Sequence, residues 1–256
     1  MMGGSWLVPW HPRPDEHPLL VCMPPAGAGC GQFGAWQTAL GDDVSVVGVQ
    51  LPGRETRWAD PEPSTMGEAV EAVVAELTGL VSTGHPTVLF GHSFGGLLAY
   101  EVAGSLWRQW RTWPRALVVA ACKPPREWVG AGRGLADDED ELTDLLDARG
   151  LEAEDMDEDS RELMLEVLRQ DARLSLSFAE PDQPVVDCPL EAWGGRDDLT
   201  VSHEHVADWR DYAGGEFQER LFPGGHYFCL ETPAPALELL RSMACQSPID
   251  TKGGTL

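Results

Sequence analysis

The fold is decided by one stretch, Thr87-Val-Leu-Phe-Gly91-His92-Ser93-Phe94-Gly95-Gly96-Leu-Leu-Ala-Tyr100. Its first four residues form an apolar run with the length of a buried strand. From Gly95 to Trp110 the apolar residues recur at helical spacing. The Gly-x-Ser-x-Gly pattern between the two is typical of a sharp strand-to-helix turn that exposes a serine hydroxyl above a sheet. We expect Ser93 at that turn, with glycines where a side chain would collide with the neighbouring strand or helix.

Further strands are predicted on both sides of this motif. Short apolar runs occupy residues 18–23, 44–49, 116–122, 190–193 and 217–222. Helical patterns alternate with them: Thr65-x-x-Glu68 is a capping box that begins a helix through about Val81. Thr232-Pro233 offers an N-cap followed by a first-turn proline for the last helix. This alternation predicts an α/β fold with a mostly parallel, doubly wound sheet.

One region interrupts the alternation, because residues 123–189 contain no strand pattern. Two helical patterns occupy residues 140–149 and 160–178, and each carries an apolar stripe: Leu142, Leu145 and Leu146 in the first, Leu163, Met164, Val167 and Leu168 in the second. Residues 137–171 hold sixteen acidic residues and three arginines. The insertion leaves the carboxyl end of a parallel strand, where such sheets bind ligands. We therefore expect a helical lid over about 124–185, the alternative being a solvated helical insertion without a role in binding.

The domain organisation expected for 256 residues is a single α/β domain over 18–245 that contains this insertion. Residues 1–17 hold three prolines and no periodicity, so they are expected to be an irregular N-terminal segment. Residues 246–256 carry turn residues without a pattern and are expected to form a flexible tail.

The charge balance excludes several classes of protein. The chain has 18 Lys and Arg against 42 Asp and Glu, a formal net charge of −24, which argues against binding nucleic acid or anionic lipid. No apolar run reaches the length of a membrane helix, and the N-terminus lacks the features of a secretory signal. The six cysteines are scattered and are expected to be reduced thiols in a cytoplasmic protein. No metal-ligand spacing is present, so no metal is expected.

The strand–Ser–helix motif predicts the chain order Ser, then Asp or Glu, then His. Of the histidines after Ser93, His226 follows the last strand in a glycine turn and is expected to be the general base. His203 and His205 begin an acidic helical stretch and are expected at the surface. The strand at 190–193 runs into Asp197-Asp198, and either carboxylate could orient the histidine. Asp198 is preferred because Val201 then anchors the following turn, which Asp197 would cap.

An oxyanion hole needs two backbone N–H groups. One is expected from Phe94, directly after the serine, and the other from Ala26 in the small-residue loop that follows the first strand. His92 lies next to the serine but should face away from it, in a structural role. A competing motif, Gly29-x-Gly31-x-x-Gly34, matches a dinucleotide fingerprint, but the second strand ends without the acidic residue which that fold requires.

Together, these motifs resemble a family. PPAGAG after the first strand, VQLPGRETRW at 49–58, GHSFGG at the turn, and then GGRDD and FPGGHYF are similar in order to the type II thioesterases of polyketide and nonribosomal peptide assembly lines. The resemblance covers roughly residues 18–240. It implies the α/β-hydrolase fold and a triad of Ser93, Asp198 and His226. The first loop departs from the family's Pro-His-Ala-Gly-Gly, because Pro25 stands where the histidine is usual.

The resemblance implies hydrolysis of acyl groups from the phosphopantetheine arm of acyl or peptidyl carrier proteins, with small acyl thioesters as further substrates and no cofactor. Carrier proteins of these systems are acidic, so Lys123, Arg126 and Arg133 are expected to dock them near the site. The alternatives are a stand-alone serine esterase or a cyclising release thioesterase on the same fold, and a non-catalytic binding protein.

Overall fold

Buried apolar strands form the centre of the molecule. The computed structural model describes residues 4–12, 14–81, 85–131, 135–138, 140, 142–143, 157–181 and 185–246. Its sheet has seven strands in the order β1-β3-β2-β4-β5-β6-β7. The strands are β1 (Leu7–Pro9), β2 (Leu19–Met23), β3 (Ser45–Val49), β4 (Thr87–His92), β5 (Ala116–Ala120), β6 (Leu190–Gly195) and β7 (Phe217–Phe222). Strands β2 to β7, the six predicted strands, run parallel to one another.

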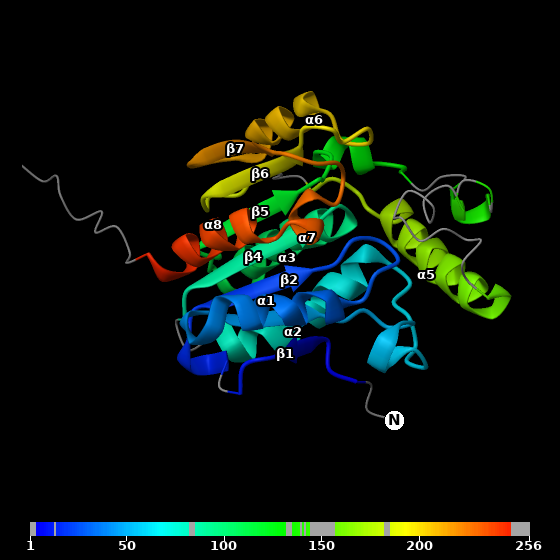
Figure 1. Cartoon of the computed structure of the whole chain (residues 1–256), viewed down its shortest axis with the longest axis horizontal. Coiled ribbons are helices and arrows are strands. Elements are labelled where there is room, and N and C mark those ends of the chain that lie inside the picture. The colour runs from blue at the N-terminus through cyan, green and yellow to red at the C-terminus, as the bar shows by residue number, and fades with distance from the viewer. Residues whose placement is uncertain are drawn as a thin grey trace, which may run out of the picture.

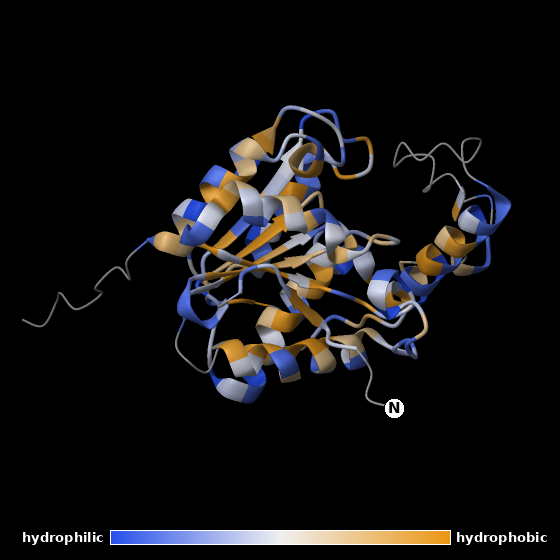
Figure 2. Ribbon diagram, turned by 60° about the horizontal axis from the view of Figure 1, so that its bottom comes forward, coloured by the Kyte–Doolittle hydropathy of each residue, from blue (hydrophilic) through white to orange (hydrophobic). Residues whose placement is uncertain are grey.

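Helices cover both faces of this sheet because side chains alternate along each strand. Leu19, Val21 and Met23 point to the face that packs on α2 (Met66–Val81) and α3 (Phe94–Trp110). Leu20 and Cys22 point to the other face, which packs on α1 (Gly34–Leu40) and α8 (Ala234–Cys245). Figure 2 shows the apolar strands lying between the two helical layers. The doubly wound architecture is thereby confirmed, with α6 (His203–Asp208) and α7 (Phe228–Glu231) as short additional helices.

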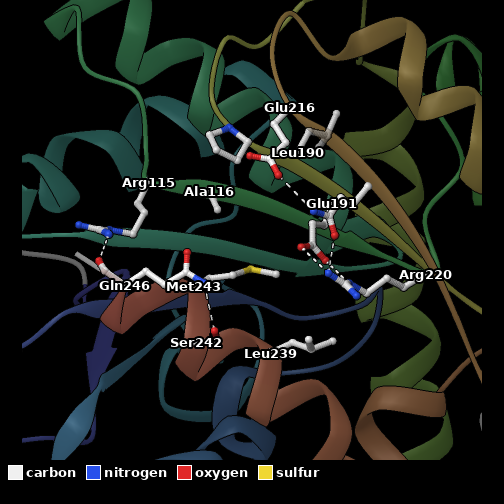
Figure 3. A pocket seen from close by; sticks show the side chains of 12 residues that line it. Arg115, Ala116, Leu190, Glu191, Glu216, Arg220, Leu239, Ser242, Met243 and Gln246 are labelled. Atoms are coloured by element: carbon white, nitrogen blue, oxygen red, sulfur yellow. Dashed lines mark hydrogen bonds and ion pairs between the residues drawn. The ribbon is translucent and has the colours of Figure 1, made fainter. Parts of the chain in front are cut away.

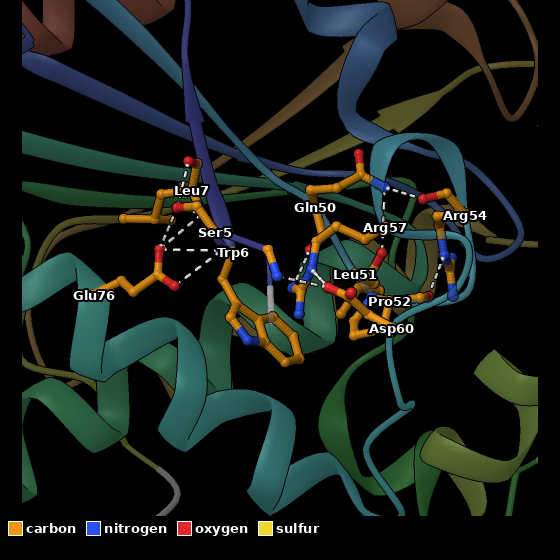
Figure 4. A network of polar contacts seen from close by, with 11 residues as sticks. Ser5, Trp6, Leu7, Gln50, Leu51, Pro52, Arg54, Arg57, Asp60 and Glu76 are labelled. Carbon is orange, nitrogen blue, oxygen red and sulfur yellow. Dashed lines mark hydrogen bonds and ion pairs between the residues drawn. The ribbon is translucent and has the colours of Figure 1, made fainter. Parts of the chain in front are cut away.

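The N-terminal segment corrects one prediction. Residues 1–17 were expected to be irregular, yet Leu7–Pro9 form β1, which pairs antiparallel with β3 at the sheet edge. The Glu76 carboxylate of α2 accepts hydrogen bonds from the Trp6 and Leu7 N–H groups and from the Ser5 hydroxyl (Figure 4). Three residues are too few to give a visible period, and this strand depends on the partners that the fold supplies.

The insertion contains a long helix, α5 (Glu158–Leu176), which begins at Asp157, whose side chain accepts the Ser160 N–H. Figure 1 places α5 beyond the ends toward which the strand arrows point. Its apolar stripe differs from the prediction, because Leu163 is 56% exposed whereas Leu165 is buried. Leu165 and Leu168 pack against Leu142. Most of the predicted helix at 140–149 and the tail beyond Gln246 lie outside the described residues.

Candidate active site

Ser93 occupies the turn between β4 and α3, as predicted. Its backbone has φ 54° and ψ −120°, a strained region for a residue with a side chain, and its N–H donates to the Ala120 carbonyl at 2.8 Å. A Cβ on Gly91 would lie 2.0 Å from the Gly95 carbonyl oxygen, and one on Gly95 would lie 2.2 Å from that of Met23. The two glycines therefore let helix and strands approach closely enough to hold the serine in this conformation.

The structure brings Asp198 and His226 together from the loops after β6 and β7. The Asp198 Oδ2 lies 2.8 Å from His226 Nδ1. Asp198 Oδ1 accepts the N–H groups of Thr200 and Val201 at 2.8 and 3.0 Å. The prediction that Asp197 caps this turn is therefore wrong: Asp198 caps it, and Asp197 is exposed.

The environment of Asp198 favours its ionised form. Burial would raise the pKa of this carboxyl, whose side chain has no solvent-exposed surface. The hydrogen bond and charge of His226 and the two backbone donors act in the opposite direction, and the pKa lies below its ordinary value. An ionised Asp198 accepts a proton-bearing Nδ1, so the opposite nitrogen of His226, Nε2, is left to act as the base.

The neighbouring histidines lie where structural roles were expected. The His92 Nε2 is 2.8 Å from the His226 carbonyl oxygen, and its buried ring stacks on Tyr227. His92 thus braces the loop that carries His226. His203 is exposed on α6, and His205 completes a capping box with Ser202.

A cavity of about 290 Å³ joins Ser93 and His226. In the described part of the chain, no hydrogen bond links the serine hydroxyl to the imidazole, as is common before substrate binds. Ala26 and Phe94 line the same cavity. Phe94 is the first residue of α3, and the first N–H groups of a helix have no partner within it. Ala26 belongs to the loop after β2, so the two expected oxyanion donors lie on adjacent strand ends.

The remaining walls come from the insertion and from loops after the strands. Leu168, Asp171, Ala172 and Ser175 line the cavity from α5, and their spacing places them on one helix face. Trp128 and Tyr227 contribute aromatic walls, and Lys123 and Glu127 contribute charges. Because α5 supplies one wall of the cavity that holds Ser93, it occupies the position of the expected lid.

The three residues expected to dock a carrier protein differ in their surroundings. Lys123 lines the cavity. Arg126 forms ion pairs with Asp208 and Asp211, so its charge is compensated within the chain. Arg133 lies outside the described residues.

The glycines of the dinucleotide-like motif, Gly29-x-Gly31-x-x-Gly34, contact a carboxylate of the chain itself. The Gly31 N–H donates to the Glu55 carboxylate at 3.2 Å, and a Cβ on Gly29 would lie 2.1 Å from that carboxylate. An anionic side chain therefore already occupies the position that a pyrophosphate would need. Within the described ranges, no cluster of three or more His, Cys, Asp or Glu side chains is arranged to hold a metal ion. No helix of the described residues has the length and apolarity to cross a membrane.

Comparison with known proteins agrees with this geometry. The model of the family described as "Thioesterase domain" matches residues 18–242. The chain belongs to the thioesterase domain family. It is 30% identical over 230 residues to the thioesterase PikA5 of Streptomyces venezuelae, covering 88% of this chain and 80% of that protein.

Two solved structures extend the comparison. RedJ, a thioesterase from the prodiginine pathway of Streptomyces coelicolor, is 35% identical, with a TM-score of 0.79 over 90% of this chain and 87% of that one. The type II thioesterase BorB of the borrelidin biosynthetic cluster is 27% identical, with a TM-score of 0.81 over 95% of this chain and 99% of that one. The resemblance inferred from the motifs and the expected α/β-hydrolase fold are confirmed, and this thioesterase is a hydrolase.

A larger cavity of about 490 Å³ lies elsewhere in the thioesterase (Figure 3). It is lined by the first residues of β5 and β6, Ala116 and Leu190, and by Met243 of α8. Ligands of such sheets bind at the carboxyl ends of the strands, so we assign the chemistry to the smaller cavity. In the larger one, the Glu191 carboxylate accepts hydrogen bonds from the Arg220 guanidinium and from the Trp193 indole N–H. This arrangement identifies a partly buried structural ion pair.

Sequence reasoning missed part of the site. It assigned no role to Arg54, although the run Leu51-Pro-Gly-Arg-Glu55 is distinctive of the resemblance, and it did not single out Asp171. The motif around Arg54 could have identified that residue as functional. Asp171 is one of the sixteen acidic residues of 137–171, and no local pattern distinguishes it from the others. Both are buried, and Asp171 lines the cavity.

Proposed function

We propose that this thioesterase hydrolyses acyl groups from the phosphopantetheine arm of acyl or peptidyl carrier proteins, and so removes aberrant or stalled units during polyketide or nonribosomal peptide biosynthesis. The observation that carries the proposal is the cavity beneath α5, where Ser93, His226, Ala26 and Phe94 meet. The likeness to thioesterases of such pathways, RedJ and BorB, supports it. Reduced thiols and the proposed carrier substrate support a cytoplasmic location for this activity.

The proposed mechanism uses the residues that meet in this cavity. The Ser93 hydroxyl attacks the thioester carbonyl carbon while His226 Nε2 takes its proton, with Asp198 stabilising the imidazolium. The Phe94 and Ala26 N–H groups bind the oxyanion. The carbon–sulfur bond then breaks, the pantetheine thiol leaves with the proton, and an acyl-serine ester remains. Water, deprotonated by His226, hydrolyses the ester, which releases the carboxylic acid and restores Ser93.

Intact-mass spectrometry of acetyl- and propionyl-loaded carrier protein tests the proposal directly. Incubation with the wild-type enzyme should convert each to the free-thiol carrier, and Ser93→Ala should not. Survival of the acyl carrier while a simple oxygen ester is cleaved would replace the proposal by a stand-alone esterase. A macrocyclic product would favour a release enzyme. Failure of Ser93 to react with a fluorophosphonate would favour a binding protein.

We further propose that Lys123 and Arg126, together with Arg133, form the carrier-docking surface. Lys123→Glu should raise KM for acyl-carrier substrate about tenfold, the size of one lost charge-assisted contact, and leave KM for small thioesters unchanged. Arg126→Ala should act less strongly because Asp208 and Asp211 already compensate that charge. Arg111→Glu, at the far end of α3, is the matched control. An equal rise in KM for both substrates would contradict docking at Lys123.

A further inference from the structure

Arg54 and Asp171 form a buried ion pair that the mechanism above does not use. Arg54 Nη1 donates to Asp171 Oδ2 and Nη2 to Oδ1, both at 2.7 Å. The side chains are 5% and 0% exposed. Such a two-pronged contact fixes relative orientation as well as distance. It therefore holds the loop after β3 and helix α5 in one arrangement.

The same pair binds the backbone of the loop that carries Ala26. Asp171 Oδ2 also accepts the Gly27 N–H at 2.6 Å, and Arg54 Nη1 also donates to the Ala28 carbonyl at 3.3 Å. Gly27 has φ +70°, a conformation that glycine adopts without strain. Because the Ala26–Gly27 peptide is planar, holding the Gly27 N–H sets the orientation of that peptide unit. The expected donor, the Ala26 N–H, belongs to the preceding Pro25–Ala26 peptide, whose Pro25 carbonyl accepts the Ala28 N–H at 3.1 Å.

Other polar residues of the loop after β3 hold the rest of this backbone. Gln50 Oε1 accepts the Cys30 N–H at 3.2 Å, and the Glu55 carboxylate accepts that of Gly31. Figure 4 shows Gln50 and Arg54 in this network, with the Gln50 amide donating to the Arg54 carbonyl. Residues 50–55 thus support residues 27–31, and among these described contacts only Asp171 comes from the insertion.

Asp171 also belongs to the wall of the active-site cavity, on the same face of α5 as Leu168 and Ala172. Ala26 itself packs against the cluster of Leu142, Leu165 and Leu168. One carboxylate therefore links the seating of the lid helix to the conformation of the oxyanion loop.

We propose that Arg54 and Asp171 are positioning residues for the oxyanion hole: together they hold the loop from Pro25 to Ala28, and with it the Ala26 N–H, in its productive orientation only while α5 is seated. The proposal rests on the proposed function, since it assigns Ala26 as an oxyanion donor. Acyl transfer then requires a seated lid, because departure of Asp171 removes the acceptor of Gly27. This proposal gives the distinctive Leu51-Pro-Gly-Arg-Glu55 run a role, because its arginine positions the oxyanion loop.

The test uses Arg54→Met, Asp171→Leu, Asp171→Asn and the double variant Arg54→Met/Asp171→Leu. Each is compared in melting temperature, in kcat and KM for a small acetyl thioester, and in affinity for a boronic acid that forms a tetrahedral adduct on Ser93. We expect kcat to fall about 10- to 100-fold, the scale of a misplaced catalytic group, with little change in KM. Boronate affinity should fall in parallel, because the adduct needs the same donors.

The double variant separates positioning from folding. Removal of both charges should restore the melting temperature relative to the single variants, since no unpaired buried charge remains, while kcat stays low. Gln170→Ala is the control, because it removes a different α5 contact, to the Pro63 carbonyl at 2.9 Å, and should keep wild-type kcat.

A double variant with wild-type kcat and boronate affinity would overturn the proposal and leave the pair a purely structural one. If the proposed function itself is wrong, the measurements would differ already for the wild-type enzyme. In that case the wild type would not hydrolyse the thioester but would still bind the boronate. Loss of that binding in the Arg54 and Asp171 variants would then uphold the positioning role.

Discussion

Asp198, in the loop after β6, and Glu101, on α3, show that burial alone does not decide the charge of a carboxylate. Asp198 receives hydrogen bonds from His226, Thr200 and Val201, and its pKa is lowered. Burial raises the pKa of Glu101 on α3 to about 6, because the charge of Arg108, 3.9 Å away, offsets only part of the desolvation. The pKa values of the two carboxyl groups shift in opposite directions because Asp198 accepts more hydrogen bonds than Glu101 does.

Asp198→Asn should lower kcat by about 10³- to 10⁴-fold, because an amide does not hold His226 in the tautomer that leaves Nε2 basic. The change also tests the pKa. The ionised carboxylate stabilises the fold above the unfolded value of 3.8, and this contribution is lost as the pH falls through the lower folded value. The gap in melting temperature between wild type and variant should therefore narrow below about pH 4. A constant gap would contradict the lowered pKa.

Glu101→Gln should stabilise the protein at pH 8. The folded protein keeps a proton on Glu101 between pH 4.5 and about 6, whereas the unfolded chain has lost it, so stability falls as the pH rises through this interval. Removing the charge should raise the free energy of unfolding by up to about 2 kcal/mol at pH 8 and by less at pH 5. Urea unfolding measures both values, with the exposed Glu71→Gln on α2 as the control. An equal gain at both pH values would refute this account.

At the scale of elements, the strand–turn–helix unit depends on how closely its parts approach. Met23 ends β2, and its carbonyl lies where a side chain on Gly95 would be. Helix α3 consequently packs against β2, β4 and β5 at a separation that only glycine permits at its first turn. The strained Ser93 backbone is held by this packing and by the bond to Ala120.

Gly95→Ala should therefore destabilise the fold by several kcal/mol, because backbone atoms at 2.2 Å must separate. Gly79→Ala is the matched control, since nothing lies within 4 Å of a Cβ there. Within α2 it should gain up to about 1 kcal/mol from helix propensity. Denaturant midpoints compare the two. A stable Gly95→Ala protein with wild-type kcat would show that the turn between β4 and α3 tolerates a wider spacing of helix and strand.

At the scale of the whole molecule, charge is unevenly distributed. The net charge is −24, and the sixteen acidic residues of 137–171 concentrate much of it in the insertion. Helix α5 nevertheless stays attached to the α/β domain through neutral or buried contacts with residues 54–66: the Arg54–Asp171 pair, Gln170 to the Pro63 carbonyl, and Met66 N–H to Ser177. Self-repulsion of this kind opposes compact folding at low ionic strength.

Raising NaCl from 0.01 to 0.2 M should therefore raise the melting temperature by a few degrees, because screening shortens from about 30 Å to below 10 Å. The rise should level off above about 0.2 M, when most exposed charges no longer interact. A linear rise beyond that concentration, or a fall, would indicate that the salt acts other than by screening.

The sequence by itself determined the alternating strands and helices, the sharp strand-to-helix turn at Ser93 and the order of the candidate triad. Each of these features depends on a local periodicity or on a short motif whose glycines are sterically required. It did not show β1, whose three residues form a strand only because β3 and Glu76 supply partners. For the acidic member of the triad, the sequence left two adjacent candidates, Asp197 and Asp198. A preference for one of them could be argued only from the following turn and from the family resemblance.

Tertiary structure decided what depends on residues far apart in the chain. The placement of His226 opposite Asp198 requires the loops after β6 and β7 to lie side by side. The rotation of α5, which buries Leu165 and exposes Leu163, is set by the surface on which it packs. The Arg54–Asp171 pair joins residues 117 positions apart. No local pattern encodes such a contact, because only the folded sheet determines which loop backbone meets which helix face.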